Sequence, residues 1–164
     1  MIKLMNAELV VFAETGKLDL NFVSVATDFL RTYADRCHHG KEEGILFRDL
    51  VRKNPSEKDK TTMRELIEDH IYARKTVTNL LQTAGKYASG NVESIDEASR
   101  LIKDLTEFYP RHIQKEDKHF FYPSMEYFSP TEQQSMLQEF WESDRNLIHE
   151  KYAKVIEDLE HSAH

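Results

Sequence analysis

Residues that break helices occupy few positions in this sequence, and this feature limits the possible folds most strongly. The chain has 164 residues but only five glycines and four prolines. A long stretch with a helical pattern runs from Glu57 to about Ser89, and Gly90 ends it. Residues at helical spacing share one face of this stretch: Met63, Leu66, Ile67, His70, Ala73, Val77 and Leu81. The pattern predicts long amphipathic helices that pack against one another.

Turn-forming residues mark the boundaries of the first two helices. Gly16 and Lys17 interrupt the first apolar stretch. Asp19 is placed to cap a second helix, which should run to about Lys53. This second helix should end at Asn54-Pro55-Ser56, and the next helix contains His70.

Two capping boxes predict where the later helices begin. Ser94-Ile95-Asp96-Glu97 should start a fourth helix, which Pro110 should kink and Phe121-Tyr122-Pro123 should close. Ser129-Pro130-Thr131-Glu132 should start a last helix that ends near Glu160. Because the connections are short, neighbouring helices should be antiparallel. We therefore predict an all-α fold, an up-down antiparallel four-helix bundle with an additional C-terminal helix, formed by residues 1–164 as a single domain.

Charge and cysteine content exclude several classes of partner. The formal charge is −7 with dispersed acidic residues, which disfavours nucleic acid and favours cations. The sequence has no apolar run long enough to span a membrane and no secretory signal pattern. Cys37 is the single cysteine, so it forms no intrachain disulfide and fits a reducing compartment. These features predict a cytoplasmic protein with no membrane partner.

The most informative motif is an internal echo. Residues 38–47 read HHGKEEGILF, and residues 112–121 read HIQKEDKHFF. Each copy has a histidine, carboxylates four and five places later, and an apolar pair eight and nine places later. Residues four apart on a helix lie about 5 to 6 Å apart at Cβ, so the imidazole and carboxylate can reach one metal ion. Helical bundles build two-metal sites from such pairs on facing helices.

An explanation without a metal must be weighed against this one. Histidine–glutamate pairs at this spacing are common on solvated helix surfaces, and a lone His70 on an apolar face is more often a satisfied core residue. However, His70, His112 and Glu116 all fall on predicted buried faces. An unpaired buried polar group costs about 1 to 3 kcal/mol there. A cation would compensate several such groups at once, with His70 as a further ligand.

At these residues the sequence resembles the hemerythrin-like, HHE cation-binding family. Three stretches carry the likeness: Asp28 to Glu43, Asp69-His70 with Arg74, and Tyr109 to Pro123. The resemblance implies a four-helix bundle around an oxo- or hydroxo-bridged di-iron centre with terminal histidines and two bridging carboxylates. By motif, the implied metal ligands are His38, Glu42, His70, His112 and Glu116. Arg74 stands where animal hemerythrins have another histidine, so this set is poorer in histidine.

Two adjacent pairs compete for the metal on the second helix. The echo and the family register select His38 and Glu42, whereas a simple helical wheel places His39 and Glu43 nearer the core. A π-bulge, which Gly40 and Gly44 could allow, would swing the helix face. We therefore add His39 to the predicted metal ligands. His39 and Glu43 would be extra ligands or outer partners that fix imidazole orientation.

The first helix lacks the histidine that the family takes from it. Residues 1–15 contain no histidine. At a rise of about 1.5 Å per residue, the position level with His38 falls about five residues before Met1. We hypothesise that the chain begins at an internal methionine and lacks the turns that would complete the second metal position. Glu8 is the nearest substitute, but it should lie about three turns too close to Gly16.

Other candidate residues carry weaker signals. His149 could approach the site from the last helix or simply pack, His119 should be exposed, and His161 and His164 belong to a tail that should fray. Four aromatic residues either line an oxygen-sized apolar pocket or belong to the plain core: Phe120, Phe121, Tyr122 and Phe128.

These features predict a non-haem iron protein. Imidazole and carboxylate ligands suit iron, with manganese or zinc as substitutes. The family implies two ions, and the short first helix leaves one ion as an alternative. The leading hypothesis is a protein that binds or senses dioxygen, nitric oxide or iron. The alternatives are a di-iron enzyme that reduces peroxide or oxygen or donates iron for cluster repair, and a helical interaction module without metal. The oligomeric state stays open, a homodimer included.

Overall fold

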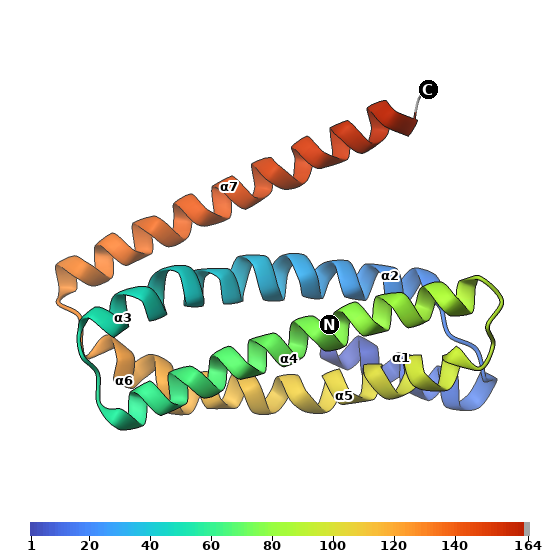
Figure 1. Cartoon of the computed structure of the whole chain (residues 1–164), viewed down its shortest axis with the longest axis horizontal. Coiled ribbons are helices and arrows are strands. Elements are labelled where there is room, and N and C mark those ends of the chain that lie inside the picture. The colour runs from blue at the N-terminus through green and yellow to red at the C-terminus, as the bar shows by residue number, and fades with distance from the viewer. Residues whose placement is uncertain (163–164) are drawn as a thin grey trace.

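Helices account for most of the chain, as Figure 1 shows. The computed structural model describes the backbone of residues 1–162 and the side chains of residues 1–151. The α-helices are α1 (Ile2–Thr15), α2 (Leu20–Phe29), α3 (Arg48–Arg52), α4 (Glu57–Ala88), α5 (Ser94–Lys115), α6 (Phe121–Met125) and α7 (Pro130–Ser162). Three π-helical segments are η1 (Leu30–His39), η2 (Glu42–Phe47) and η3 (Glu116–Phe120).

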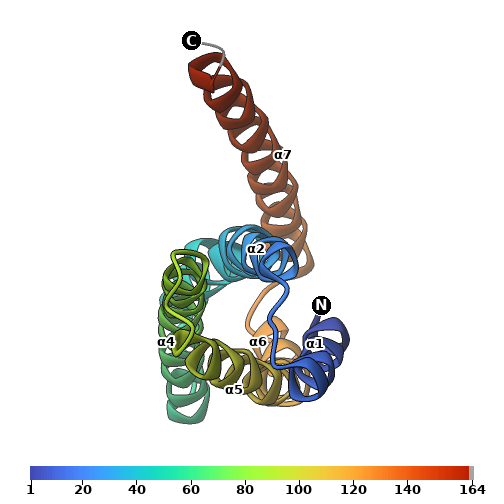
Figure 2. The same ribbon diagram turned by 90° about the vertical axis from the view of Figure 1, so that its right-hand side faces the viewer.

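Four antiparallel arms form the bundle. The second arm runs from α2 through η1 and η2 to α3, and the fourth runs from α5 through η3 to α6. The end view in Figure 2 shows α1, α5, α4 and α2 around a common axis. Helix α4 packs against both α2 and α5, and α1 packs against α5. The predicted four-helix bundle with an additional C-terminal helix is confirmed.

Several predicted helix boundaries are confirmed by their capping contacts. The Asp19 carboxylate accepts hydrogen bonds from the backbone N–H groups of Asn21 and Phe22. At the end of the second arm Asn54 adopts a left-handed φ of 50°, and Gly90 after α4 adopts a φ of 95°. These positive φ values let the chain reverse, and glycine adopts them without a steric penalty.

The two predicted capping boxes have different outcomes. Before α7, the Glu132 carboxylate accepts from the Ser129 backbone N–H at 2.9 Å, and the Ser129 hydroxyl accepts from the Glu132 N–H at 3.4 Å. The box predicted at Ser94 is wrong. Its hydroxyl instead donates to the Asn91 carbonyl at 2.6 Å, and α5 begins without a side-chain cap. The preceding turn offers that carbonyl acceptor, which competes with the helix N–H groups for the serine.

The apolar core consists of two clusters, and buried histidines lie between them. One cluster includes Met5, Leu80, Ala73 and Tyr109, and the other includes Leu50, Leu66 and Phe120. Along α4, His70 lies between Leu66 and Ala73, and along the fourth arm His112 lies between Tyr109 and Phe120. Both imidazoles are buried. A buried polar layer therefore crosses the middle of the bundle.

One core position on α4 differs from the prediction. Leu81 is 40% exposed, whereas Leu80 is 1% exposed. One row of buried positions on this helix has spacings that alternate between four and three residues: Leu66, His70, Ala73, Val77 and Leu80. A step of three therefore follows Val77, and it places Leu80 rather than Leu81 in the core.

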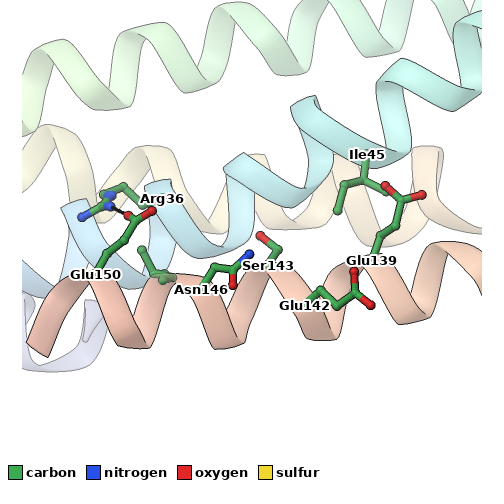
Figure 3. Close-up of a pocket in the computed structure, with 8 residues that line it drawn as sticks. Arg36, Ile45, Glu139, Glu142, Ser143, Asn146 and Glu150 are labelled. Atoms are coloured by element: carbon green, nitrogen blue, oxygen red, sulfur yellow. Dashed lines mark hydrogen bonds and ion pairs between the residues drawn. The ribbon is translucent and has the colours of Figure 1, made fainter. Parts of the chain in front are cut away.

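Helix α7 contacts the bundle only along part of its length. It starts beside α3 and α6 and diverges from the second arm toward its C-terminal end (Figure 1). Ion pairs join the two, including Lys41 to Asp144 and Arg48 to Glu139. Between them lies a polar cavity of about 390 Å³ whose lining residues come from α7, η1 and η2 (Figure 3). No helix in the described part of the chain is long and apolar enough to cross a membrane.

Candidate metal centre

Six predicted site residues converge in the polar layer. The structure arranges them as two triads, one of His39, His70 and His112 and one of His38, Glu42 and Glu116. Within each triad, one potential ligand atom per residue lies within 4.8 Å of the others. We call these groups the imidazole triad and the carboxylate triad.

Five segments supply these side chains. Both adjacent histidines come from η1, Glu42 from η2, and Glu116 from η3. His70 comes from α4 and His112 from α5. Segments η2 and η3 lie within the two copies of the sequence echo, and η1 reaches the first copy only at His38 and His39.

The π-helical backbone explains why both His38 and His39 lie in the polar layer. A π turn closes through an i to i+5 hydrogen bond, so it holds one more residue than an α turn. Both histidines consequently reach the same layer. The predicted π segment is present, but it leaves room for a Cβ at both glycines. A Cβ at Gly44 would meet no atom within 4 Å, and one at Gly40 would make an ordinary 3.7 Å contact with the Asp35 carbonyl.

The two carboxylates connect the triads. Glu42 Oε2 lies 3.3 Å from His70 Nε2, and its Oε1 lies 3.6 Å from His38 Nε2. Glu116 Oε1 lies 2.9 Å from His112 Nε2, and its Oε2 lies 3.6 Å from His38 Nε2. Each carboxylate thus touches imidazoles of both triads, which is the position that a bridging carboxylate needs.

Several polar atoms in this layer have no hydrogen-bond partner despite their short separations. They are buried and include both oxygens of Glu42, Oε1 of Glu116, and Nε2 of His70 and of His112. Each such atom is costly to bury without a partner. One or two cations between these atoms would satisfy all of them, so the donor set fits a metal. Imidazole nitrogen and carboxylate oxygen together suit iron or manganese.

Burial and close charges shift the pKa values of these groups in opposite directions. Burial raises the pKa of Glu42 and lowers the pKa of His39. Burial also opposes protonation of His70, but the nearby carboxylates of Glu116, Glu42 and Glu43 outweigh it and raise the pKa of His70 to about 9. For Glu116, the nearby imidazoles of His112, His38 and His70 outweigh burial and lower the pKa. Positive charge is therefore stabilised at this place.

Glu43 lies outside the two triads, in the role of an outer partner. Its Oε1 accepts from His70 Nδ1 at 2.7 Å and from Arg74 Nη2 at 2.8 Å. Burial acts to raise the pKa of Glu43, but the hydrogen bonds from Arg74 and His70 outweigh burial, so the pKa is lowered. Asp35 and Asp69 hold comparable positions beside His39 and His112. Sequence reasoning did not assign them a role, because their partners lie on other turns and other helices.

A mainly apolar cavity of about 630 Å³ opens beside both triads. His38, His39, His112 and Glu116 form its polar wall. The rest of its lining comes from Met1, Ile2, Lys3, Phe29, Leu30, Tyr33, Ala34, Tyr109, Ile113, Asp117 and Phe121. A molecule that enters this cavity reaches the candidate metal centre directly.

Helix α1 supplies no member of either triad. Its first turn lines the cavity, while the Glu8 carboxylate accepts from the Asp19 backbone N–H at 2.9 Å, beside the turn after α1. Glu8 is therefore too far along the helix to serve as a ligand, as its position in the sequence predicts.

The remaining candidates have separate outcomes. His119 and His149 are exposed and belong to neither triad. The side chains of His161 and His164 lie outside the described residues. Among the four aromatic residues, Phe121 lines the cavity, Phe120 and Phe128 belong to an apolar cluster, and Tyr122 is 80% exposed.

Comparison with known proteins adds one match. Residues 2–123 match the family described as the hemerythrin HHE cation binding domain. The match spans all six triad residues and ends before α7. Searches of curated proteins and of solved structures returned no match. Because the matched segment covers most of the 164 residues, the chain belongs to the hemerythrin HHE cation-binding family.

Proposed function

We propose that this protein binds two iron ions in the polar layer and uses them to bind or sense a small molecule such as dioxygen or nitric oxide. The observation that carries the proposal is the pair of adjacent triads with unpartnered buried ligand atoms. His39, His70 and His112 would hold one ion, His38 would hold the other, and Glu42 and Glu116 would be shared. Bound iron would supply an exchangeable coordination position.

The two metal positions should differ in affinity. The imidazole triad has three buried nitrogen donors, whereas the carboxylate triad has one histidine, whose side chain is 44% exposed. The second ion depends on shared carboxylates and lacks a donor from α1. We therefore expect a tighter ion at the imidazole triad and a weaker ion, with more open positions, beside the cavity.

The surrounding residues prepare the site for an uncharged ligand. Phe29, Leu30 and Phe121 line the cavity and limit water near the ions. A poorly hydrated pocket favours small apolar molecules over water and strengthens the electrostatic interactions inside it.

The decisive experiment is anaerobic reconstitution with Fe(II). The metal-free protein should take up about two irons per chain by elemental analysis, and its ultraviolet bands should change on exposure to oxygen. His112→Ala should lose most of the iron. His119→Ala is the matched control, because His119 follows on the same arm but is exposed, and it should retain the iron. Protein that retains no iron and melts at the same temperature with and without a chelator would exclude the proposal.

One observation favours an enzyme as the second candidate. The cavity volume of about 630 Å³ is much larger than a diatomic molecule requires, since a water molecule in the liquid occupies only about 30 Å³. A di-iron enzyme that reduces organic hydroperoxides would use that space for the organic group of its substrate. Turnover of peroxide by the iron-loaded protein, abolished in Glu116→Ala, would support this candidate over simple binding.

We also propose a cytoplasmic location. The Cys37 thiol is half-buried and donates to Asp144 Oδ1 at 3.1 Å, and its burial raises its pKa. A raised thiol pKa keeps the cysteine protonated and unreactive. The support for the location is that a single free cysteine fits a reducing compartment. Labelling of the protein in intact cells with a membrane-impermeant reagent would contradict this location.

A further inference from the structure

Each ring of the imidazole triad has a carboxylate beside its Nδ1 atom. His70 Nδ1 lies 2.7 Å from Glu43 Oε1, His112 Nδ1 lies 3.3 Å from Asp69 Oδ2, and His39 Nδ1 lies 3.4 Å from Asp35 Oδ1. The three rings have at most 1% of their side-chain surface exposed, whereas the three carboxylates are 25% to 32% exposed. The carboxylates therefore stand behind the rings, on the solvent side of the centre.

Each of these carboxylates forms an ion pair with a basic side chain. Arg74 serves two of them, with Nε 2.7 Å from Asp35 Oδ1 and Nη2 2.8 Å from Glu43 Oε1. Lys115 Nζ lies 2.8 Å from Asp69 Oδ2. Arg74 stands one turn after His70 on α4, and its guanidinium spans carboxylates from η1 and η2.

This arrangement selects which nitrogen of each ring faces the metal centre. A carboxylate accepts a hydrogen bond from a protonated nitrogen beside it, so in the neutral rings of His70 and His112 Nδ1 carries the hydrogen and Nε2 keeps the free lone pair. Consistent with this, Nε2 of His70 and of His112 point to Glu42 and Glu116 and have no hydrogen-bond donor of their own. At His39, Nδ1 forms no hydrogen bond, and Asp35 Oδ1 at 3.4 Å is the carboxylate oxygen beside it. The planar guanidinium can hold two carboxylates at fixed angles, which a single ammonium group cannot do.

We propose that Arg74 is a positioning residue that orients His39 and His70 through Asp35 and Glu43, and that Lys115 does the same for His112 through Asp69. The inference rests on the proposed metal site, since it explains how three rings present Nε2 to one ion. Arg74 stands where animal hemerythrins have another histidine. In this chain it would support two metal ligands from outside the centre.

The test uses the Zn(II)-loaded protein, because Zn(II) is diamagnetic and allows NMR of the imidazole N–H groups. Wild type should show three slowly exchanging Nδ1–H signals and Nε2 shifts typical of metal-bound nitrogen. In Arg74→Gln, the Nδ1–H signals of His39 and His70 should shift and exchange faster with water, while the His112 signal should stay unchanged. Lys115→Gln should show the reverse pattern.

Metal affinity provides an independent readout. Loss of such outer partners typically lowers metal affinity by about 10- to 100-fold, and we expect this for Arg74→Gln and Lys115→Gln by competition with a chelator. Arg64→Gln is the matched control, because Arg64 lies on the same helix but bonds only to Lys60 O and the Thr61 hydroxyl. Arg74→Lys is the milder variant should Arg74→Gln fail to fold, and it should disturb at least one of the two rings.

The outcomes separate the two proposals. Wild type that binds no Zn(II) would overturn the metal site and this inference together. Wild type that binds Zn(II), with Arg74→Gln giving unchanged affinity and unchanged His39 and His70 signals, would overturn only the positioning role.

Discussion

His38 and His39 are neighbours in the sequence, yet they belong to different triads. The His39 imidazole is buried against His70, with ring centroids 3.9 Å apart, whereas the His38 side chain is 44% exposed. Removal of each ring should therefore affect a different ion. Substitution of each histidine in turn would therefore distinguish the two metal positions.

We predict that His38→Ala reduces the iron content from about two ions to about one and changes the melting temperature little. The remaining ion should be the one held by the imidazole triad. His39→Ala should release the tighter ion and leave a cavity, which costs more stability. Elemental analysis together with calorimetric titration would measure both effects. Equal iron loss in the two variants would contradict separate positions.

At the far end of the bundle, Tyr127 supports the start of α4. Its hydroxyl donates to the buried Asp59 carboxylate at 2.6 Å and accepts from the Ser56 backbone N–H at 3.0 Å. We predict that Tyr127→Phe lowers the free energy of unfolding by about 1 to 3 kcal/mol at neutral pH, since a hydrogen bond to a charged group is lost. Urea denaturation would measure the change.

The same contact has a defined pH dependence. Hydrogen bonds from Ser56 and Tyr127 lower the pKa of Asp59. A carboxyl group with a lowered folded-state pKa contributes stability above its unfolded pKa, near 3.9, and loses it as the pH falls through the folded pKa. The stability difference between wild type and Tyr127→Phe should therefore shrink in acid. A difference that stays constant from pH 7 to pH 3 would contradict this role.

Among the elements, the π-helical segments decide the register of the site. Segment η1 ends at His39 and η2 begins at Glu42, so the extra residue of a π turn controls which side chains enter the polar layer. The segments have a longer hydrogen-bonded ring than an α-helix, a geometry found mostly at functional sites.

We predict that deletion of Tyr33, which is 62% exposed in η1, removes metal binding while the helix content is maintained. A shorter segment can regain α-helical hydrogen bonds, but His38 and His39 then rotate by about 100° relative to the preceding residues. Circular dichroism would follow helix content, and elemental analysis would follow iron. Tyr33→Ala keeps the register and should keep its iron.

The sequence predicted most elements because their boundaries depend on local signals. Asp19, Asn54 and Gly90 act through their own backbone geometry, and the echo identified residues that share a face. The Ser94 box could not be predicted correctly, because the competing acceptor comes from the conformation of the preceding turn. Asp69 had no local signal, since its contact with His112 depends on which helices become neighbours. Asp35 lies four residues before His39 on the same segment, so this spacing was a local signal that sequence reasoning did not use.

At the scale of the whole molecule, α7 is the least integrated part. It lies beyond the family match, and a polar cavity separates part of it from the second arm. Its contacts include exposed ion pairs, for example Arg36 to Glu150 and Lys151 to Asp28. Such pairs are individually weak and are screened by salt.

We predict that high salt loosens α7 while the bundle stays folded. The Debye length falls from about 10 Å at 0.1 M to about 3 Å at 1 M salt, so the ion pairs that join α7 to the second arm should weaken. Trypsin should then cleave at Arg145 and Lys151 faster in 1 M than in 0.1 M NaCl, and the segment up to Ser129 should persist. An unfolded substrate would correct for the effect of salt on trypsin itself. Salt-independent cleavage of α7 would mean that apolar contacts hold it.

The polar layer that divides the apolar core has a consequence for cooperativity. Without an ion, the two clusters on either side are joined by groups that lack hydrogen-bond partners, so one end of the bundle can open while the other stays closed. An ion would tie three arms of the bundle together at the middle. Hydrogen exchange should show two protection levels in the metal-free protein and a single level once iron is bound, so that the cofactor sets the size of the unit that unfolds.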